Sequence, residues 1–168
     1  LDRTAGGPPV PLKVQPDGRV VIKEQGLPRP TDKWRRSIYV LARRNYQLSM
    51  LAMFDQPIVS TNCTRRTPSA VVTQSLTMLN DQFVLEHTDF FAQRVAEQTK
   101  TEQQIDLAFR IALGRSPKVE EAKWCGELLS RHAERYRQQN LADKEATRRA
   151  LTHLCHVLLN TSEFLYAR

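Results

Sequence analysis

The chain has 168 residues, of which 40% are apolar and 26% are charged, and its formal net charge is +7. This length predicts one domain with a core large enough to fold without disulfide or metal support. No run of about 18 apolar residues occurs, so the sequence predicts no membrane-spanning helix and no membrane partner.

The positive charge is concentrated in the first third of the chain. Residues 1–50 hold ten basic and four acidic residues. The excess gathers around Lys33, Arg35, Arg36, Arg43 and Arg44. Such a basic front can bind nucleic acid or another polyanion. Because no nucleic-acid recognition motif accompanies it, we expect the front to face a neighbouring domain rather than nucleic acid.

Residues 1–34 are predicted to form an N-terminal arm with a β-hairpin. Residues 11–14 and 20–22 have strand composition, and Pro16-Asp17-Gly18 lies between them. Proline presets φ and glycine accepts a positive φ, so this tripeptide favours a turn. A lone hairpin is marginal in water and needs a third strand or a helix against it. Residues 37–43 are predicted to supply that strand, with the start of a helix as the alternative.

Residues 35–168 are predicted to form one helical domain. Ser49 is expected to cap a short helix over 50–54. Five later segments show apolar residues at helical spacing. The third is expected to end at Gly114, and the last to run over about 143–159. The expected inward positions are Val72, Ser75, Leu76 and Leu79; Val84, Thr88, Phe91 and Val95; Ile105, Ala108, Phe109 and Ala112; Ala122, Cys125, Leu128, Leu129, His132 and Tyr136; and Ala150, Leu151, Leu154, Cys155 and Leu158. The predicted fold class is therefore mainly α, with about five helices and a small N-terminal β-hairpin.

The best candidate site is a set of polar residues between positions 45 and 80, where a hydrophobic core would not require them. They are Asn45, Asp55, Cys63, Arg65, Arg66, Gln74 and Asn80. Arg66 can pair with Asp55 through two hydrogen bonds and hold the 56–68 loop against the following helix. We expect a buried polar latch. A binding site for a ligand or a neighbouring domain, and a catalytic site, are the alternatives.

A second candidate lies near the C-terminus, where His153 and His156 are i,i+3 neighbours that can reach one metal ion. A third ligand would have to come from Cys63 or Glu163. Two ligands do not make a site, so we expect two ordinary helix histidines and no metal. The chain also lacks the CxxCH motif of covalent haem attachment, and no cofactor is predicted.

Glu86, His87 and Asp89 are residues of the kind used in acid–base chemistry. Glu86 and Asp89 share one face of a helix, whereas His87 falls on the apolar side between two phenylalanines. We interpret all three as helix-boundary residues. No nucleophile elbow and no glycine-rich phosphate loop occurs in the sequence, so no catalytic residue is predicted.

Three separated motifs together resemble a known family. They are residues 35–84, the run Ala112-Leu113-Gly114-Arg115-Ser116-Pro117 with Glu120-Glu121, and residues 154–168. In this order they resemble the C-terminal domain of unknown function of large exported planctomycete proteins. Residues 1–9 resemble the segment that precedes that domain in the family. Lys118-Val119 departs from the Thr-Pro of the family pattern, and Ser116 is then the expected cap of the following helix.

The resemblance implies a context rather than a reaction. It implies an exported, periplasmic or cell-surface location and upstream domains in the same protein, a cytochrome c-type domain among them. The first hypothesis is therefore a non-catalytic structural or interaction module. The alternatives are part of a carbohydrate-active or other hydrolytic enzyme whose site is shared with an upstream domain, and a polyanion-binding module. The resemblance supplies no substrate.

The three cysteines, Cys63, Cys125 and Cys155, show no CxxC spacing. Cys63 and Cys155 both lie inside the family-like motifs, and export would allow them to pair. Cys155 also lies on the expected inward stripe of its helix, where a buried thiol behaves as a small apolar side chain. We expect buried free thiols, with a Cys63–Cys155 disulfide as the alternative.

Overall fold

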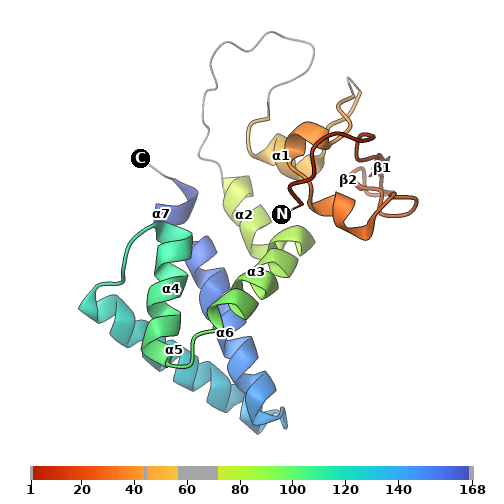
Figure 1. Ribbon diagram of the computed structural model, residues 1–168. Helices are drawn as coiled ribbons and strands as arrows, with labels where there is room; N and C mark the ends of the chain where they lie inside the picture. The colour runs from red at the N-terminus through yellow and green to blue at the C-terminus, as the bar shows by residue number, and fades with distance from the viewer. Residues whose placement is uncertain (1, 44, 57–71, 167–168) are drawn as a thin grey trace. The chain divides into compact units, whose positions relative to one another are not determined.

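The computed structural model describes residues 2–43, 45–56 and 72–166. They fall into two compact units, which we call unit 1 (1–70) and unit 2 (71–168). Unit 1 carries the β-strands and short helical turns, and unit 2 is helical (Figure 1). The domain boundary after residue 34 stays a prediction.

The hairpin of unit 1 forms where the sequence predicted it. Strand β1 (Leu12–Val14) pairs in antiparallel register with β2 (Val20–Ile22), with Lys13 opposite Val21. The turn between them contains Gly18 at a φ of 83°, a left-handed conformation that glycine adopts without a steric penalty. The predicted hairpin and its turn are confirmed.

A helix, rather than a third strand, contacts the hairpin through a hydrogen bond. Helix α1 (Ser49–Met53) begins after Leu48, so Ser49 is not the N-cap, contrary to the prediction. Its hydroxyl oxygen instead accepts a hydrogen bond of 2.8 Å from the backbone N–H of Val20 at the start of β2. The serine side chain therefore ties α1 to the hairpin.

An arginine clamp holds the first loop of the chain in unit 1. The Arg35 guanidinium donates to the carbonyl oxygens of Gly6 and Pro8 and stacks on the Tyr39 ring at 3.8 Å. Arg35 is buried, with 7% of its surface exposed. We call this group the Arg35 clamp. It explains why the loop follows Gly6 and Gly7, whose φ values of 76° and 88° suit glycine.

The strand predicted over 37–43 is wrong. Ser37–Tyr39 forms a 3₁₀ turn, and only Val40 makes a bridge, with Val10. The Arg35 clamp supplies the reason. Four residues of extended chain span about 13 Å, whereas a 3₁₀ turn brings residues four apart close enough for Arg35 to cover the Tyr39 ring. The remaining short element of unit 1 is a 3₁₀ helix over Pro30–Trp34.

Unit 2 is built from six helices within the described residues. They are α2 (Val72–Asn80), α3 (Gln82–Val95), α4 (Thr101–Leu113), α5 (Val119–Gln138), α6 (Asp143–Leu159) and α7 (Ser162–Leu165). With the hairpin of unit 1, they confirm the predicted mainly α fold class. In the described ranges, no helix combines the length and apolar character needed to cross a bilayer.

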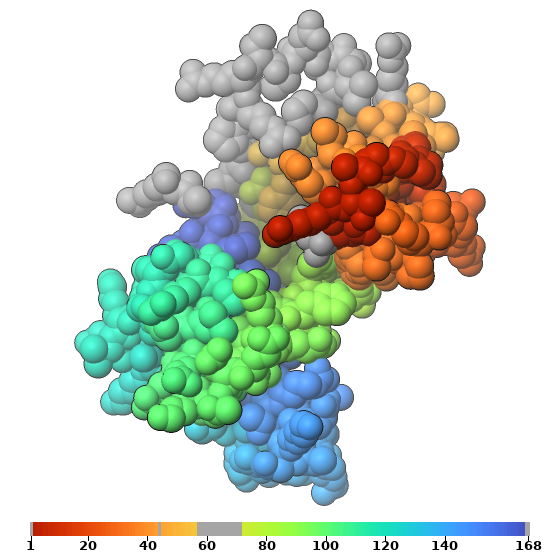
Figure 2. Space-filling view, in the orientation of Figure 1, coloured from red at the N-terminus to blue at the C-terminus, as the bar shows by residue number. Residues whose placement is uncertain are grey.

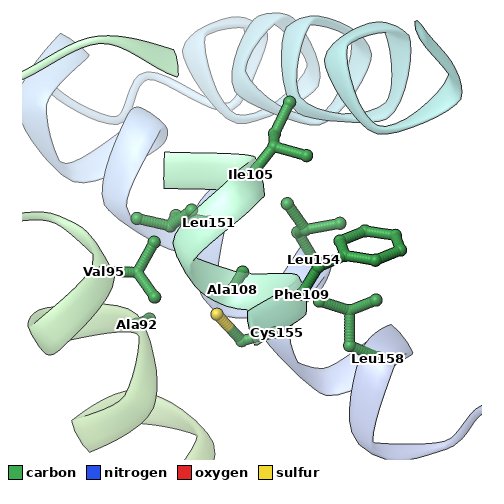
Figure 3. Close-up of a cluster of buried hydrophobic side chains, with 9 residues drawn as sticks. All are labelled: Ala92, Val95, Ile105, Ala108, Phe109, Leu151, Leu154, Cys155 and Leu158. Carbon is green, nitrogen blue, oxygen red and sulfur yellow. The ribbon is translucent and has the colours of Figure 1, made fainter. Parts of the chain in front are cut away.

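The core of unit 2 lies where α3, α4 and α6 meet (Figure 3). It contains Ala92, Val95, Ile105, Ala108, Phe109, Leu151, Leu154, Cys155 and Leu158. The five predicted inward residues of α6 are all buried, and this helix has the bounds that the sequence indicated. The inward stripes of α3 and α4 are confirmed for Val84, Thr88 and Val95 and for Ile105, Ala108 and Phe109. Phe91 and Ala112 are half-buried.

Helix α2 packs with the face opposite to the predicted one. Val72, Leu76 and Leu79 were expected inward but are exposed, whereas Gln74 and Met78 are buried. The Met78 carbonyl oxygen lies 3.1 Å from Nε2 of His156 on α6. That polar contact to a distant helix orients α2, and helical periodicity alone does not reveal it.

Helix α5 begins later than predicted. Its N-cap is Lys118, not Ser116, and the Glu121 carboxylate accepts a 2.7 Å hydrogen bond from the Lys118 N–H. This is the reciprocal half of a capping box, which satisfies an amide that the helix start leaves unpaired. The predicted inward residues of α5 are half-buried rather than buried, and Ala133 is the buried one.

Arg115 joins three elements of unit 2. It follows Gly114, which ends α4 at a φ of 70° as the sequence predicted. Its guanidinium binds both oxygens of Glu121 at 2.8 Å and both oxygens of Glu163 at 2.7 Å. Glu121 lies in the first turn of α5 and Glu163 in α7. The hydrogen bonds from Arg115 are the main cause that lowers the pKa of Glu121 to about 2.

We expect Arg115→Gln to lower the stability of unit 2 in a pH-dependent way. The Glu121 pKa is lowered from 4.5 in the folded state, so the unfolded state binds more protons over this interval. The stability that the ion pair contributes is present above pH 4.5 and disappears as the pH falls through about 2. Urea unfolding at several pH values should show wild type and variant converging in acid.

Arg110→Gln is the matched control for this prediction. Arg110 lies on α4 and forms an exposed i,i+4 ion pair of 2.9 Å with Asp106. Exposed ion pairs of this kind contribute little to the free energy of unfolding. A loss of stability for Arg115→Gln that equals the control, or that persists unchanged at low pH, would contradict the assigned role of Arg115.

Candidate functional site

The candidate site is a groove of 360 Å³ in unit 2, between α3, α5 and α6. Both polar and aromatic side chains line it. They are Leu85, Thr88, Asp89, Tyr136, Arg148, Arg149, Thr152, His153 and His156. Helices α3 and α6, which meet in the core, therefore also present side chains together with α5 at the surface.

Two carboxylates and two arginines organise the groove. Asp89 of α3 accepts hydrogen bonds from Thr152 at 3.1 Å and from Arg148 at 3.4 Å. Glu145 accepts from Arg148 at 2.9 Å and from Arg149 at 3.0 Å. Arg148, followed by Arg149, lowers the pKa of Glu145 to about 2. Glu145 is thus ionised at neutral pH, and both carboxylates are engaged with neighbouring side chains.

The histidines at the groove do not pair as the metal hypothesis required. Nε2 of His156 lies 3.1 Å from the Met78 carbonyl oxygen, whereas the His153 ring lies 4.5 Å from that of His132 on α5. Glu163, one suggested third ligand, is bound to Arg115. Among the described residues, no group of three or more His, Cys, Asp or Glu side chains is placed to hold a metal ion.

The structure separates Glu86, His87 and Asp89. Glu86 accepts a hydrogen bond from Gln82 at 3.3 Å, and Nδ1 of His87 lies 2.8 Å from the Phe83 carbonyl oxygen. Of the three residues, Asp89 alone lines the groove. Glu86 and His87 make local hydrogen bonds, whereas Asp89 bonds to α6. All three lie inside α3 rather than at its ends, so the helix-boundary interpretation is wrong.

Cys155 is a free thiol in the core of unit 2, with none of its surface exposed. Burial raises its pKa to about 12, so it is neutral and unreactive at physiological pH. Cys125 is also free and half-buried. The free-thiol expectation fits both residues, while Cys63 lies outside the described residues.

The residues of the predicted 45–80 site are only partly described. Asn45 is exposed in unit 1, and Asp55 is half-buried with a φ of 58°. In unit 2, Gln74 is buried, and the exposed Asn80 donates to the Leu76 carbonyl oxygen at 3.0 Å. Cys63, Arg65 and Arg66 lie outside the described residues. The latch and its Asp55–Arg66 pair therefore stay predictions.

Sequence reasoning missed two features. The basic front was predicted to include Arg35, but that residue is buried in the Arg35 clamp, while Arg36 and Arg43 are exposed. The groove was missed because its residues lie on three helices. Periodicity placed His132 and Tyr136 inward, yet it carries no information on which helix they face.

A family model described as PSD1, a protein of unknown function (DUF1553), matches residues 1–129. The chain belongs to this family. Because PSD1 is itself described as being of unknown function, the match transfers no substrate and no catalytic residue. No curated protein and no solved structure matches the chain.

The PSD1 match covers unit 1 with its Arg35 clamp, and it also covers Arg115 and Glu121. It ends inside α5, so the α6 side of the groove lies beyond the matched residues. Asp89 of α3 is within the match and contacts α6 residues that are outside it. The groove therefore joins the PSD1 segment to the C-terminal part of the chain.

Proposed function

We propose that this PSD1-family chain is a non-catalytic structural and interaction module of an exported multi-domain protein. Its partners in this proposal are upstream domains of the same polypeptide, including a cytochrome c-type domain. The export, the planctomycete origin and the cytochrome c-type partner rest on the resemblance of residues 35–84, 112–121 and 154–168. The PSD1 match supports that resemblance at the level of a domain of unknown function.

The observation that carries the proposal is the apolar face of α2. Val72, Leu76 and Leu79 follow each other at i, i+4 and i+7, and are 76%, 52% and 47% exposed. Helix α2 contains no charged residue. A contiguous exposed apolar surface on a soluble domain marks an interaction site, and interface centres are depleted in charge. We call this surface the α2 stripe.

The chemistry of the groove supports a role in binding over catalysis. A general acid needs a raised pKa, and the Glu145 pKa is lowered to about 2 by its arginine partners. Asp89 is held by Thr152 and Arg148 in an arrangement that links α3 to α6. Asp89 is therefore suited to holding α3 against α6, and Glu145 to bonding within α6, which weakens the hydrolase alternative.

We expect Leu76→Glu to disrupt association with the upstream domains. The 168-residue chain and the upstream domains would be produced as two polypeptides, and their association measured by isothermal titration calorimetry. A carboxylate buried in an apolar interface without a partner is costly, so we expect Kd to rise by about tenfold or more.

Thr73→Glu is the matched control, because it adds the same charge to α2 beside the stripe. We expect it to change Kd by less than about threefold. Far-UV circular dichroism should show both variants folded. Equal Kd values for Leu76→Glu and wild type would refute the α2 stripe as the interface.

A further inference from the structure

The last turns of α5 carry two arginines with no partner in the described part of the chain. Arg131 and Arg135 are both exposed, and neither makes an ion pair or hydrogen bond there. Like charges at i and i+4 destabilise an isolated helix. This end of unit 2, where α5 and α6 meet, lies at the surface in the space-filling view (Figure 2). Its arginines are thus available to a ligand.

Two imidazoles lie beside these arginines. The rings of His132 on α5 and His153 on α6 are 4.5 Å apart, and Tyr136 lies 6.5 Å from His132. No ring nitrogen of either histidine makes a hydrogen bond with the residues that the structure describes. The Arg149 guanidinium stacks near the Tyr136 ring at 6.0 Å, and His153, Tyr136 and Arg149 all line the groove. Hydrogen-bond capacity and positive charge therefore coincide at one end of the groove.

The surrounding charges decide which kind of ligand fits. Arg148 and Arg149 of α6 are paired with Asp89 of α3 and Glu145 of α6, whereas Arg135 of α5 forms no ion pair with the described residues. Arg131 lines a second pocket together with Glu102 and Glu127. Burial is the main cause that lowers the pKa of His132. The charges of His153, Arg135 and Arg131 lower it further. This excess positive charge repels a divalent cation, although paired imidazoles alone would suit one. An anion would be attracted by the unpaired Arg135 and by each protonated imidazole.

We propose that His132, Arg135, Tyr136, Arg149 and His153 form a binding site for a tetrahedral oxyanion, the phosphate or sulfate group of a ligand. We call these residues the oxyanion cluster. Arginine donors match the oxygens of such a group in pairs, and the imidazole N–H groups add donors. Each protonated imidazole adds a positive charge, so binding strengthens as the pH falls through the histidine range. The site is independent of the α2 stripe.

The test follows the four histidines of the chain by NMR during pH titration. The 168-residue chain would be titrated in chloride, inorganic phosphate or inorganic sulfate at matched ionic strength. Because an anion that binds the protonated pair favours protonation, we expect the midpoints of His132 and His153 to rise by about 0.5 pH unit or more. His87 does not line the groove and is the internal control, so it should not respond to the anion. A larger rise in phosphate than in sulfate, or the reverse, identifies the preferred group.

Arg135→Gln separates the oxyanion cluster from a general salt effect. Arg135 is exposed, so the variant should fold, and it removes one donor while leaving both imidazoles in place. Because Arg135 also contributes to lowering the pKa of His132, each rise is measured from the variant's own midpoint in chloride. We expect it to reduce the anion-induced rise at His132 and His153 at least twofold. Three results would overturn the proposal: no rise in either anion, an equal rise at all four histidines, or a full rise retained by Arg135→Gln. A lowered midpoint in zinc chloride with no anion effect would indicate a metal pair instead.

Discussion

Leu154→Ala is expected to lower the free energy of unfolding of unit 2 by about 2–5 kcal/mol. Leu154 comes from the middle of α6 and is 1% exposed, among the side chains of α3 and α4 (Figure 3). Truncation loses its apolar transfer free energy and leaves a cavity that tightly packed neighbours fill only in part. The free energy of unfolding of a typical domain is about 5–15 kcal/mol, so this loss is a large fraction of the total stability. Urea unfolding followed by far-UV circular dichroism measures it.

Val157→Ala is the matched control in the same helix. Val157 is 44% exposed, so its truncation removes little buried surface, and we expect a change of at most about 0.5 kcal/mol. If the two variants lost similar stability, the core at the meeting of α3, α4 and α6 would not carry the stability of unit 2.

Arg35→Ala is expected to destabilise unit 1 by about 2–4 kcal/mol, because it removes two hydrogen bonds from a charged donor and the stacking on Tyr39. Gly6 and Pro8 would lose the donor that binds their carbonyl oxygens. Trp34 lies in unit 1 and Trp124, 64% exposed, lies in unit 2. In a Trp124→Phe background, Trp34 fluorescence during urea unfolding therefore reports on unit 1.

Two substitutions sharpen this test. Arg36→Ala removes the same side chain from the next position, which is exposed, and should change stability by at most about 0.5 kcal/mol. Arg35→Lys keeps the charge but loses the planar fork that reaches two carbonyls and covers the ring, so it should recover only part of the loss. Full recovery by lysine would show that charge, rather than the geometry of the clamp, stabilises the loop.

Local sequence pattern was sufficient to predict the elements whose structure is decided by their own residues. The bounds of α6 followed from its uninterrupted apolar stripe, and the hairpin followed from Pro16-Asp17-Gly18, whose φ preferences are intrinsic. Gly114 was predicted to end α4 for the same reason, since glycine accepts the left-handed conformation there. With the other helical stripes, these signals were enough for the mainly α fold class.

Local sequence pattern gave wrong predictions for elements whose conformation or orientation depends on distant residues. The α2 stripe is apolar at helical spacing, yet the contact of the Met78 carbonyl with His156 turns it outward. Residues 37–43 have strand composition, yet Arg35 and Tyr39 can stack only across a turn.

The candidate site shows the same division. The sequence by itself determined the α6 helix that carries Arg149 and His153 and the α5 helix that carries His132 and Tyr136, because periodicity is a local property. Only the tertiary structure decided that His153 faces His132 rather than acting with His156, and that Arg131 and Arg135 stand near them without a carboxylate partner among the described residues. Such pairings depend on how two helices cross, and that is set by packing across the whole core.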